Sequence, residues 1–414
     1  MKDTELQPQK VEPRKKILFA YQNLILGGAE RVLVDILGIL SKYHKYDVHL
    51  LLIGDQRLAN YTIPENITVY YASSNMEAEF QVYCHSKQYN ESVTNKDYYR
   101  YWVDHFANAV NTRICDYINL HHFNLIINFE DHLDYFLKIY HIHPSIPVIR
   151  WIEVAWYLDR WLGDPEQHRP ILEKQNPFVT ICDDMYESAK KSFEQLGLSH
   201  KDIYRIYNPI NFSRILSSVD DFEEADRELL DDDFILQVAR LHPVKNQVRL
   251  VHCYKKLKDK GAIKEKLYII GTGSSEIYQE IANTIKALSL ENDCFLLGHR
   301  KNPYPFMKRA KLFVHTSLNE GLPTVLIESM VCGTPVVAMD CPFGPKEILS
   351  NGKYGGLVPL HDEEAFAEKV YELLTNEEKY QAYVSLLPEA VERFSAETVG
   401  NQIVELFDNL MNKQ

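Results

Sequence analysis

The stretch from Leu312 to Ala338 reads LFVHTSLNEGLPTVLIESMVCGTPVVA. Its two ends, Leu312 to His315 and Pro335 to Ala338, are short apolar runs of the kind that form buried parallel strands. Between them, the residues from Thr324 onward have the pattern of a helix that crosses from one strand to the next. A strand, a helix and a second strand in this order favour an α/β fold with a parallel sheet.

The same alternation of short apolar runs and helical segments continues along most of the chain. It predicts two open, doubly wound parallel sheets, each of the Rossmann-like kind. The clearest helix of the first half is Glu30 to Lys42. The further expected strands are Lys16 to Ala20, Asp47 to Ile53, Ile67 to Tyr70, Asn124 to Asn128, Pro147 to Trp151 and Pro177 to Ile181 in the first half, and Phe234 to Ala239, Leu267 to Ile270 and Cys294 to Leu297 in the second.

The length of 414 residues favours two domains rather than one hydrophobic core. The segment from Asn208 to Asp233 is the expected linker; its acidic run from Asp220 to Asp233 has no strand pattern, and a surface helix there is an equal possibility. We expect a disordered tail over residues 1–13, a first domain over 14–208, a second domain over 209–390, and a C-terminal helix over 391–414 that packs back on the first domain.

A polar, Tyr-rich stretch around residues 73–107 interrupts the strand rhythm of the first domain. It predicts an insertion, either as an extra helical subdomain with amphipathic aromatic residues or as a part that binds an acceptor, since aromatic faces stack on sugars. The sequence does not decide between these two readings.

Charge and cysteine usage exclude several classes of protein. The net charge of −13 argues against a general nucleic-acid binder, because such binding depends on Lys and Arg that displace counterions. The basic runs Arg14-Lys15-Lys16 and His299 to Lys311 are expected to be solvated faces and give weak support to contact with an anionic membrane surface. Seven cysteines without a C-x-x-C pair, and no apolar run long enough to span a bilayer, predict a cytoplasmic protein that is soluble or peripheral at the membrane face.

Polar and glycine-rich motifs follow several of the expected strands, and ligands of doubly wound sheets bind at these strand ends. In the first half, Gly27-Gly28 opens the helix from Glu30, and such a glycine pair allows close approach of a ligand and positive φ angles. A tight turn without a ligand is an equal possibility for these two glycines.

In the second half, Arg240 and Lys245 follow one strand, and two cations five residues apart can converge on one diphosphate. The turn Gly271-Thr-Gly273 follows the next strand and leads to a helix that Ser274 or Ser275 could cap, so a nucleotide could lie alongside it. An Arg in a local salt bridge, an exposed Lys and an ordinary strand-to-helix turn are the alternatives.

Two carboxylates flank the helix that begins at Thr324. Glu320 lies on the loop before it, and Glu328 lies in its second turn, so both could reach one ligand together with Leu322, Pro323 and Thr324. A carboxylate accepts two hydrogen bonds from a vicinal diol of ribose or of a hexose, and these charge-assisted bonds are strong. Without its neighbours, Glu328 could equally be an exposed helix residue that forms ion pairs along the helix.

The run EGLPTVLIESMVCGTPVVAMDCPFGPKEIL from Glu320 resembles the signature of retaining GT-B glycosyltransferases of glycosyltransferase family 4, with its Glu-x7-Glu element. The resemblance extends to Arg240-x4-Lys245, to the Gly271-x-Gly273 turn and to GGLVPL near Gly355. In the first half it is limited mainly to GGAER and YNPI. It implies a GT-B fold, in which two Rossmann-like domains face each other across a cleft.

The resemblance also implies a role for each matching residue. Glu328 would hold the ribose of a nucleoside diphosphate, and Glu320 would face the donor sugar. Arg240 and Lys245 would neutralise the diphosphate as it leaves, and Gly28 would approach the phosphates or the acceptor. Enzymes of this kind are similar in needing no metal and no cofactor beyond the nucleotide-sugar co-substrate, which fits the lack of a clear ligand cluster in the sequence.

One position departs from the family pattern. Family members commonly carry a His after a Trp-x pair at the end of a first-domain strand, where this chain has Trp151-Ile152-Glu153. We expect Glu153 to bind a hydroxyl or to stabilise positive charge at the anomeric carbon. His132, His141 and His143 are the neighbouring alternatives, although a His in a polar loop is more often structural.

These features predict a retaining, metal-independent hexosyltransferase of surface polysaccharide, lipopolysaccharide or glycolipid synthesis. It would move a hexose or N-acetylhexosamine from a nucleotide sugar to a saccharide or lipid-linked saccharide. The CPFGPKEIL extension, residues 341–349, is similar to that of enzymes that use UDP-sugars, and a GDP-mannose-dependent mannosyltransferase is left open. An enzyme that cleaves or isomerises sugar nucleotides, and an inert partner subunit that only binds them, are the other readings.

Overall fold

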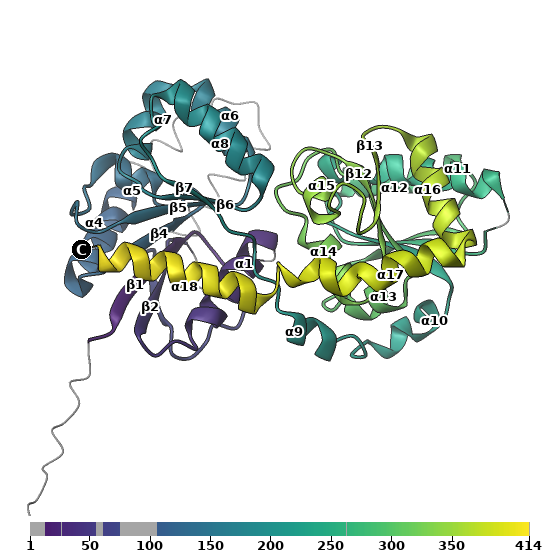
Figure 1. The fold of residues 1–414 in the computed structure, drawn as a ribbon, viewed down its shortest axis with the longest axis horizontal. Coiled ribbons are helices and arrows are strands. Elements are labelled where there is room, and N and C mark those ends of the chain that lie inside the picture. The colour runs from purple at the N-terminus through teal and green to yellow at the C-terminus, as the bar shows by residue number, and fades with distance from the viewer. Residues whose placement is uncertain (1–12, 26, 55–60, 75–105, 262, 414) are drawn as a thin grey trace, which may run out of the picture. The chain divides into compact units, whose positions relative to one another are not determined.

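The computed structural model describes residues 13–25, 27–54, 61–74, 106–261 and 263–413. They contain one sheet of seven strands in the order β3-β2-β1-β4-β5-β6-β7 and one of six strands in the order β10-β9-β8-β11-β12-β13 (Figure 1). Both sheets carry helices on their two faces, which confirms the expected pair of doubly wound, parallel-sheet layers. Most of the expected insertion around 73–107, and all but one residue of the expected tail, lie outside the described residues.

Contacts divide the chain into two compact units. The first comprises Met1–Trp151, Glu166–Phe178 and Val404–Gln414, and the second comprises Ile152–Pro165 and Val179–Ile403. The division does not follow the sheets, because the last residues of β5 and β6, and all of β7, belong to the second unit. Each unit is described by itself below.

The first sheet forms where the sequence has short runs of apolar and β-branched residues. Its order reverses between β1 and β4, since the chain leaves β1 toward β2 and leaves β4 toward β5. Ligands of open α/β sheets bind beside such a reversal, at the carboxyl ends of the strands. The strands are β1 (Lys15–Tyr21), β2 (Tyr46–Leu52), β3 (Thr68–Tyr71), β4 (Leu125–Phe129), β5 (Val148–Ile152), β6 (Phe178–Thr180) and β7 (Ile203–Arg205), of which β7 was not predicted.

The helices that belong to this sheet follow the predicted crossovers. The buried residues of α1 recur on one face at helical spacing, from Val32 to Leu40, and so pack against the sheet. The helices are α1 (Gly28–Leu40), α4 (Asn108–His121), α5 (Asp134–Ile139), α6 (Trp156–Gly163), α7 (Pro165–Leu172) and α8 (Asp183–Leu196).

The second sheet has a core of Ile, Leu and Val from its strands and from the flanking helices. Its strands are β8 (Phe234–Val238), β9 (Lys266–Ile270), β10 (Cys294–Gly298), β11 (Leu312–His315), β12 (Val336–Asp340) and β13 (Gly356–Pro359), and its helices are α11 (Gln247–Lys260), α12 (Ser275–Ala287), α13 (Tyr304–Arg309), α14 (Thr324–Val331), α15 (Pro345–Ile348), α16 (Glu363–Thr375) and α17 (Glu377–Glu392). The strand β13 was not predicted, and the rest of the strand order agrees with the expected rhythm.

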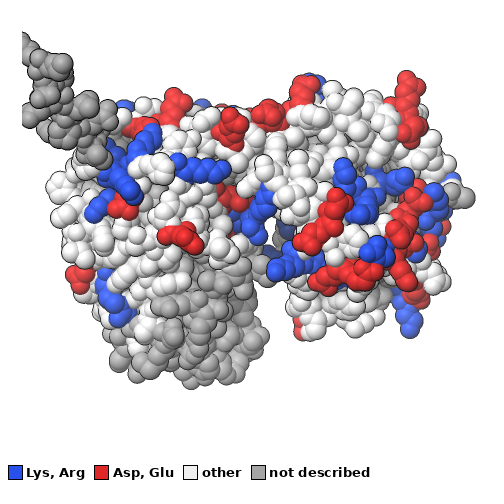
Figure 2. Space-filling view, turned by 90° about the horizontal axis from the view of Figure 1, so that it is seen from below, with Lys and Arg blue, Asp and Glu red and all other residues white. Residues whose placement is uncertain are grey.

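The expected linker from Asn208 to Asp233 is partly helical, and acidic residues in it are paired. It forms α9 (Phe212–Ser217), a 3-10 turn (Glu224–Asp226) and α10 (Arg227–Leu230). Asp226 is 5% exposed and accepts hydrogen bonds from Arg300 Nε at 2.8 and 3.0 Å. The basic run from His299 therefore neutralises acidic residues of this segment, and Figure 2 shows basic and acidic side chains intermingled on the face that it draws.

The C-terminal helix α18 (Ala396–Asn412) enters the first unit at Val404. There the ring of Phe407 packs against Phe19 of β1, with 6.2 Å between centroids. Tyr46 Oη donates a hydrogen bond to Asp408 at 2.7 Å. Among the described helices, none combines the length and the apolar character that crossing a bilayer requires.

Candidate functional site

The loops at the carboxyl ends of β8, β9, β11 and β12 are joined by main-chain hydrogen bonds. Leu241 N donates to Thr272 O, and Leu318 N donates to Val244 O, both at 2.8 Å. Glu320 N donates to Pro342 O at 3.1 Å. Four loops from different strands therefore form one continuous rim at the edge of the sheet where ligands of this fold class bind.

The glycines of the Gly271-x-Gly273 turn allow two of these loops to touch. Gly271 has φ +149°, and a Cβ there would lie 1.9 Å from Ala239 O. A Cβ at Gly273 would lie 2.1 Å from Leu241 O. Close packing between the loops therefore explains why both positions are glycine. The turn leads into α12, where Ser274 caps the helix by accepting a hydrogen bond from Ile277 N.

The loop after β8 holds Lys245 in a defined place. His242 caps a short 3-10 turn by accepting a hydrogen bond from Val244 N, and Asn246 takes a left-handed conformation with φ 56°. Thr316 Oγ1 donates to Asn246 O at 3.2 Å. The backbone on both sides of Lys245 is therefore tied down before any ligand binds.

Lys245, Glu320 and His315 form a charged cluster at this rim. Lys245 Nζ lies 2.6 Å from each carboxylate oxygen of Glu320, and His315 Nε2 lies 3.1 Å from Glu320 Oε1. Burial would raise the pKa of Glu320, but His315 and Lys245 outweigh it and lower the pKa to about 2. Glu320 is therefore a buried carboxylate that stays ionised.

Arg240 lies on the same loop and is exposed, with its carbonyl held by Gln247 Nε2 at 3.0 Å. Burial lowers the pKa of His242, and the charges of Arg240 and Lys245 lower it further. Both cations thus lie near one imidazole, and their sharing of an anionic ligand stays a prediction.

Helix α14 begins at Thr324 as predicted and places Glu328, which is half-buried, in its second turn. Leu322 is 6% exposed, and Pro323 is buried directly before the helix. Burial and the charge of Glu328 raise the pKa of the Cys332 thiol to about 12. Glu328 lies one helical turn before Cys332. It is half-buried, whereas the side chain of Glu320 is buried.

The loop after β12 packs against the loop that carries Glu320. Gly344 has φ +96°, and a Cβ there would lie 2.4 Å from Pro323 Cδ and 3.0 Å from Gly321 O. A side chain at this position would strain the backbone and push against the segment that carries Glu320. The sequence pattern contained this glycine, but its packing role was not foreseen.

Glu153 follows β5 directly, at the carboxyl edge of the first sheet, as the alignment of its motif placed it. It is 6% exposed and accepts a hydrogen bond from Asn208 Nδ2 at 2.7 Å. That bond connects it to the YNPI segment within the second unit. Its catalytic role remains a prediction.

The glycine pair of the first half does not use the positive φ angles that the sequence allowed, and that expectation was wrong. Gly27 is extended with φ −172°, and Gly28 is the first residue of α1. A Cβ at Gly28 would meet no described atom within 4 Å. A ligand could approach Gly28 because the space beside it is free of described atoms, and not because the backbone there has an unusual conformation.

His132 is the histidine that the structure places at the carboxyl edge of the first sheet. It follows β4, and its ring packs edge-on against Tyr21 at the end of β1, with 4.4 Å between centroids. Its Nε2 lies 3.5 Å from Glu130 Oε2, and Glu130 has a left-handed φ of 61°. His132 thus lies at the point where the strand order reverses.

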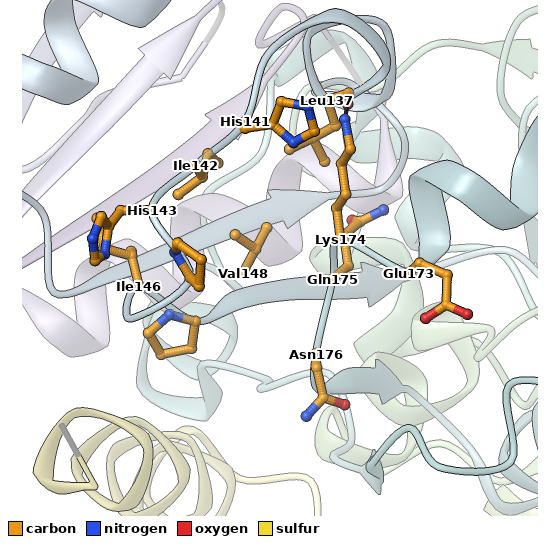
Figure 3. A pocket seen from close by; sticks show the side chains of 12 residues that line it. Leu137, His141, Ile142, His143, Ile146, Val148, Glu173, Lys174, Gln175 and Asn176 are labelled. Carbon is orange, nitrogen blue, oxygen red and sulfur yellow. Dashed lines mark hydrogen bonds between the residues drawn. The ribbon is translucent and has the colours of Figure 1, made fainter.

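His141 and His143 lie at the other edge of that sheet. They line a pocket of about 330 Å³ together with residues that precede β5 and β6 (Figure 3). Lys174, whose side chain crosses this pocket, donates to Leu137 O and to Tyr140 O, the latter at 3.2 Å. Its charge caps the end of α5, and the pocket lies at the amino ends of the strands, away from the edge where ligands of this fold class bind.

Two residues of the second unit were missed by reasoning from the sequence. His315 is the last residue of β11, and its position at a strand end was the signal that could have revealed it. Glu347 accepts hydrogen bonds from Asp183 N at 2.8 Å and from Tyr207 Oη at 2.6 Å, and burial raises its pKa. Among the described residues, no group of three or more His, Cys, Asp or Glu could hold a metal ion.

Comparison with known proteins agrees with this arrangement. Residues 219–385 match the family model of glycosyl transferases group 1. The chain is 25% identical over 371 residues to a Campylobacter jejuni enzyme, N-acetylgalactosamine-N,N'-diacetylbacillosaminyl-diphospho-undecaprenol 4-alpha-N-acetylgalactosaminyltransferase, with 88% of this chain and 92% of that protein covered. It is 27% identical over 214 residues to the poly(ribitol-phosphate) alpha-N-acetylglucosaminyltransferase of Staphylococcus aureus, with 51% of this chain and 41% of that protein covered.

Among solved structures, the chain is similar to HepE of Anabaena, which was crystallised with UDP and glucose. The TM-score is 0.69 at 20% identity, and the match covers 96% of this chain and all of the other. Together with the two parallel sheets, this likeness establishes the fold. The protein has the GT-B fold, and the match to the model of glycosyl transferases group 1 lies within its second half, at residues 219–385.

Proposed function

We propose that this protein is a retaining hexosyltransferase of glycosyltransferase family 4 that transfers a hexose or N-acetylhexosamine from a UDP-linked donor. The observation that carries the proposal is the rim of the second sheet, where Lys245 lies beside the buried carboxylate of Glu320 and Arg240 lies on the same loop as Lys245. Two cations at strand ends suit a diphosphate, and an ionised carboxylate beside them suits the hydroxyls of its sugar.

The acceptor that we propose is a saccharide or a lipid-linked saccharide of surface polysaccharide or glycolipid synthesis. The names of the relatives support this class, because the Campylobacter enzyme is named for a diphospho-undecaprenol-linked substrate and the Staphylococcus enzyme for a polymer. A lipid-linked acceptor would bring the protein to the cytoplasmic face of the membrane as a peripheral protein.

The proposed mechanism needs few protein groups. Cleavage of the anomeric C–O bond leaves an oxocarbenium-like sugar and a diphosphate, and Lys245 and Arg240 would stabilise the charge that develops on the leaving phosphate oxygen. The acceptor hydroxyl would attack from the same face, and its proton would pass to that phosphate oxygen. Retention then follows without a covalent intermediate on the protein.

Metal independence is part of the same proposal, because two cations would take the charge of the diphosphate. The test is a donor screen with UDP- and GDP-sugars and lipid-linked acceptors, with and without EDTA. We expect transfer from a UDP-sugar, unchanged by EDTA, and an α-linked product by NMR from an α-linked donor. A β-linked product would contradict retention. Binding of UDP without turnover of any donor would favour an inert binding subunit.

A further inference from the structure

Glu320 is a buried carboxylate with two partners of very different mobility. Its side chain is 8% exposed, and a charge removed from water in this way needs compensation. Lys245 supplies it, with Nζ 2.6 Å from both oxygens. His315 is the second partner, with Nε2 3.1 Å from Oε1.

Lys245 is free to turn toward a ligand, whereas His315 is not. The Lys245 side chain is 24% exposed, and its four-carbon stem is flexible. His315 is 1% exposed and ends β11, where its backbone pairs with Ala338 of β12. A diphosphate at the rim can therefore draw Lys245 away from Glu320, while His315 has to stay in place.

The imidazole contacts Glu320 without full hydrogen-bond geometry. Its Nε2 lies 3.1 Å from Oε1, close enough to help lower the pKa of Glu320, but the alignment falls short of a hydrogen bond, and Nδ1 has no hydrogen-bond partner among the described residues. Lys245 occupies both carboxylate oxygens. Once Lys245 turns away, a small rotation of the carboxylate can align Oε1 with Nε2, in the tautomer that carries its proton there.

We propose that His315 is a positioning residue of the donor site: it takes over Glu320 when Lys245 turns to the diphosphate, and it holds that carboxylate toward the donor sugar. The inference rests on the proposed function. It differs from a purely structural role, because His315 would then support binding of the sugar and not binding of the nucleoside diphosphate alone.

The experiment compares UDP with UDP-sugar. Calorimetry measures the Kd of UDP and of UDP-glucose or UDP-N-acetylgalactosamine, whichever the wild-type protein turns over, and kinetics measures kcat. His315→Leu removes the donor group at similar volume, and we expect weaker UDP-sugar binding and lower kcat by about 10- to 100-fold, the loss typical of a hydrogen bond to a charged group. UDP binding should change less than about twofold, within the error of additivity for an untouched contact.

Two further variants keep the test decisive if His315→Leu does not fold. His315→Gln places an amide N–H near the position of Nε2 and should recover most of the UDP-sugar affinity, whereas His315→Asn is too short to reach Glu320 and should not. The matched control is His49→Leu, because His49 is 3% exposed on β2 and contacts Tyr117 Oη at 2.6 Å, far along the chain from the rim. It should leave the ratio of the two affinities unchanged.

Two results would overturn the inference. One is an equal loss of UDP and UDP-sugar affinity in His315→Leu and His315→Asn, which indicates a structural residue. The other is wild-type behaviour of His315→Asn. A wild-type protein that binds and turns over no UDP-sugar would instead overturn the proposed function, so the two failures are distinguishable.

Discussion

The carboxyl edges of the two sheets are built differently. At the second sheet, four loops share main-chain hydrogen bonds, and Gly271, Gly273 and Gly344 let backbones approach closer than any side chain would permit. Buried charges are paired there, as Lys245 and Glu320 are. This edge is preorganised, with its polar groups held before a ligand arrives.

The edge of the first sheet is less uniform in the residues that the structure describes: Glu153 is buried and accepts a hydrogen bond from Asn208, whereas Gly28 and His132 lie in more open surroundings. A Cβ at Gly28 would meet no described atom within 4 Å, and His132 has its carboxylate neighbours at 3.5 and 3.9 Å rather than in short ion pairs. The difference teaches that one edge suits a single, demanding ligand such as a diphosphate, while the other suits ligands that vary. In the proposed function these are the donor and the acceptor.

The strongest test of the preorganised edge is Lys245→Ala. We expect kcat/KM for transfer to fall by about 1000-fold, because a preorganised charge on the leaving group is removed. Lys256→Ala on α11, whose ammonium lies 3.7 Å from Glu364, is the matched control and should keep wild-type activity. A loss of less than tenfold in Lys245→Ala would mean that the charge on the diphosphate is met elsewhere.

The next effect concerns Glu328, the residue proposed for the ribose. Glu328→Ala should weaken UDP binding by about 10- to 100-fold, the loss expected for hydrogen bonds to a charged group, with an unchanged melting temperature. Glu378→Ala, an exposed Glu in the first turn of α17, serves as the helix-surface control. Equal UDP affinity in Glu328→Ala and Glu378→Ala would show that Glu328 does not bind the ribose.

The edge of the first sheet is tested by Glu153. Glu153→Ala should lower kcat by about tenfold and weaken donor binding less, because a carboxylate that stabilises charge at the anomeric carbon acts most strongly in the transition state. Glu153→Gln keeps an acceptor for Asn208 Nδ2 but removes the charge. Full activity of Glu153→Gln would show that Glu153 holds Asn208 in place and that its charge takes no part in the reaction.

The smallest expected effect is on the pH dependence of the free energy of unfolding. The folded pKa of Glu320, about 2, is lower than its ordinary value of 4.5, so its contribution is complete above pH 4.5 and is lost as pH falls toward 2. Below pH 4.5, the free energy of unfolding should rise less steeply with pH in Glu320→Gln than in the wild-type protein. The two slopes should differ by up to about 1.4 kcal/mol per pH unit, which corresponds to one proton. Urea unfolding between pH 3.5 and 5 measures it, and identical slopes would show that Glu320 is not held as described.

Reasoning from the sequence predicted most strands of both sheets, because apolar runs at strand length carry a strong local signal. It missed β7 and β13, which have only three and four residues and partly exposed patterns. It placed Glu328 in the second turn of α14, since helical spacing is local. It did not foresee that Lys245 pairs with Glu320, because the two residues are 75 positions apart and meet only when β8 and β11 become neighbours.

The sequence by itself determined the class of the fold, the residues at the strand ends and the motif from which a sugar-nucleotide site is proposed. These depend on periodicity and on short spacings, which are properties of neighbouring residues. Only the tertiary structure decided that His315 contacts Glu320, that His141 and His143 lie at the amino ends of the strands, and that Gly271, Gly273 and Gly344 allow loops to touch. Those facts depend on which strands lie side by side, and no local pattern encodes the distance between loops that the chain brings together from far apart.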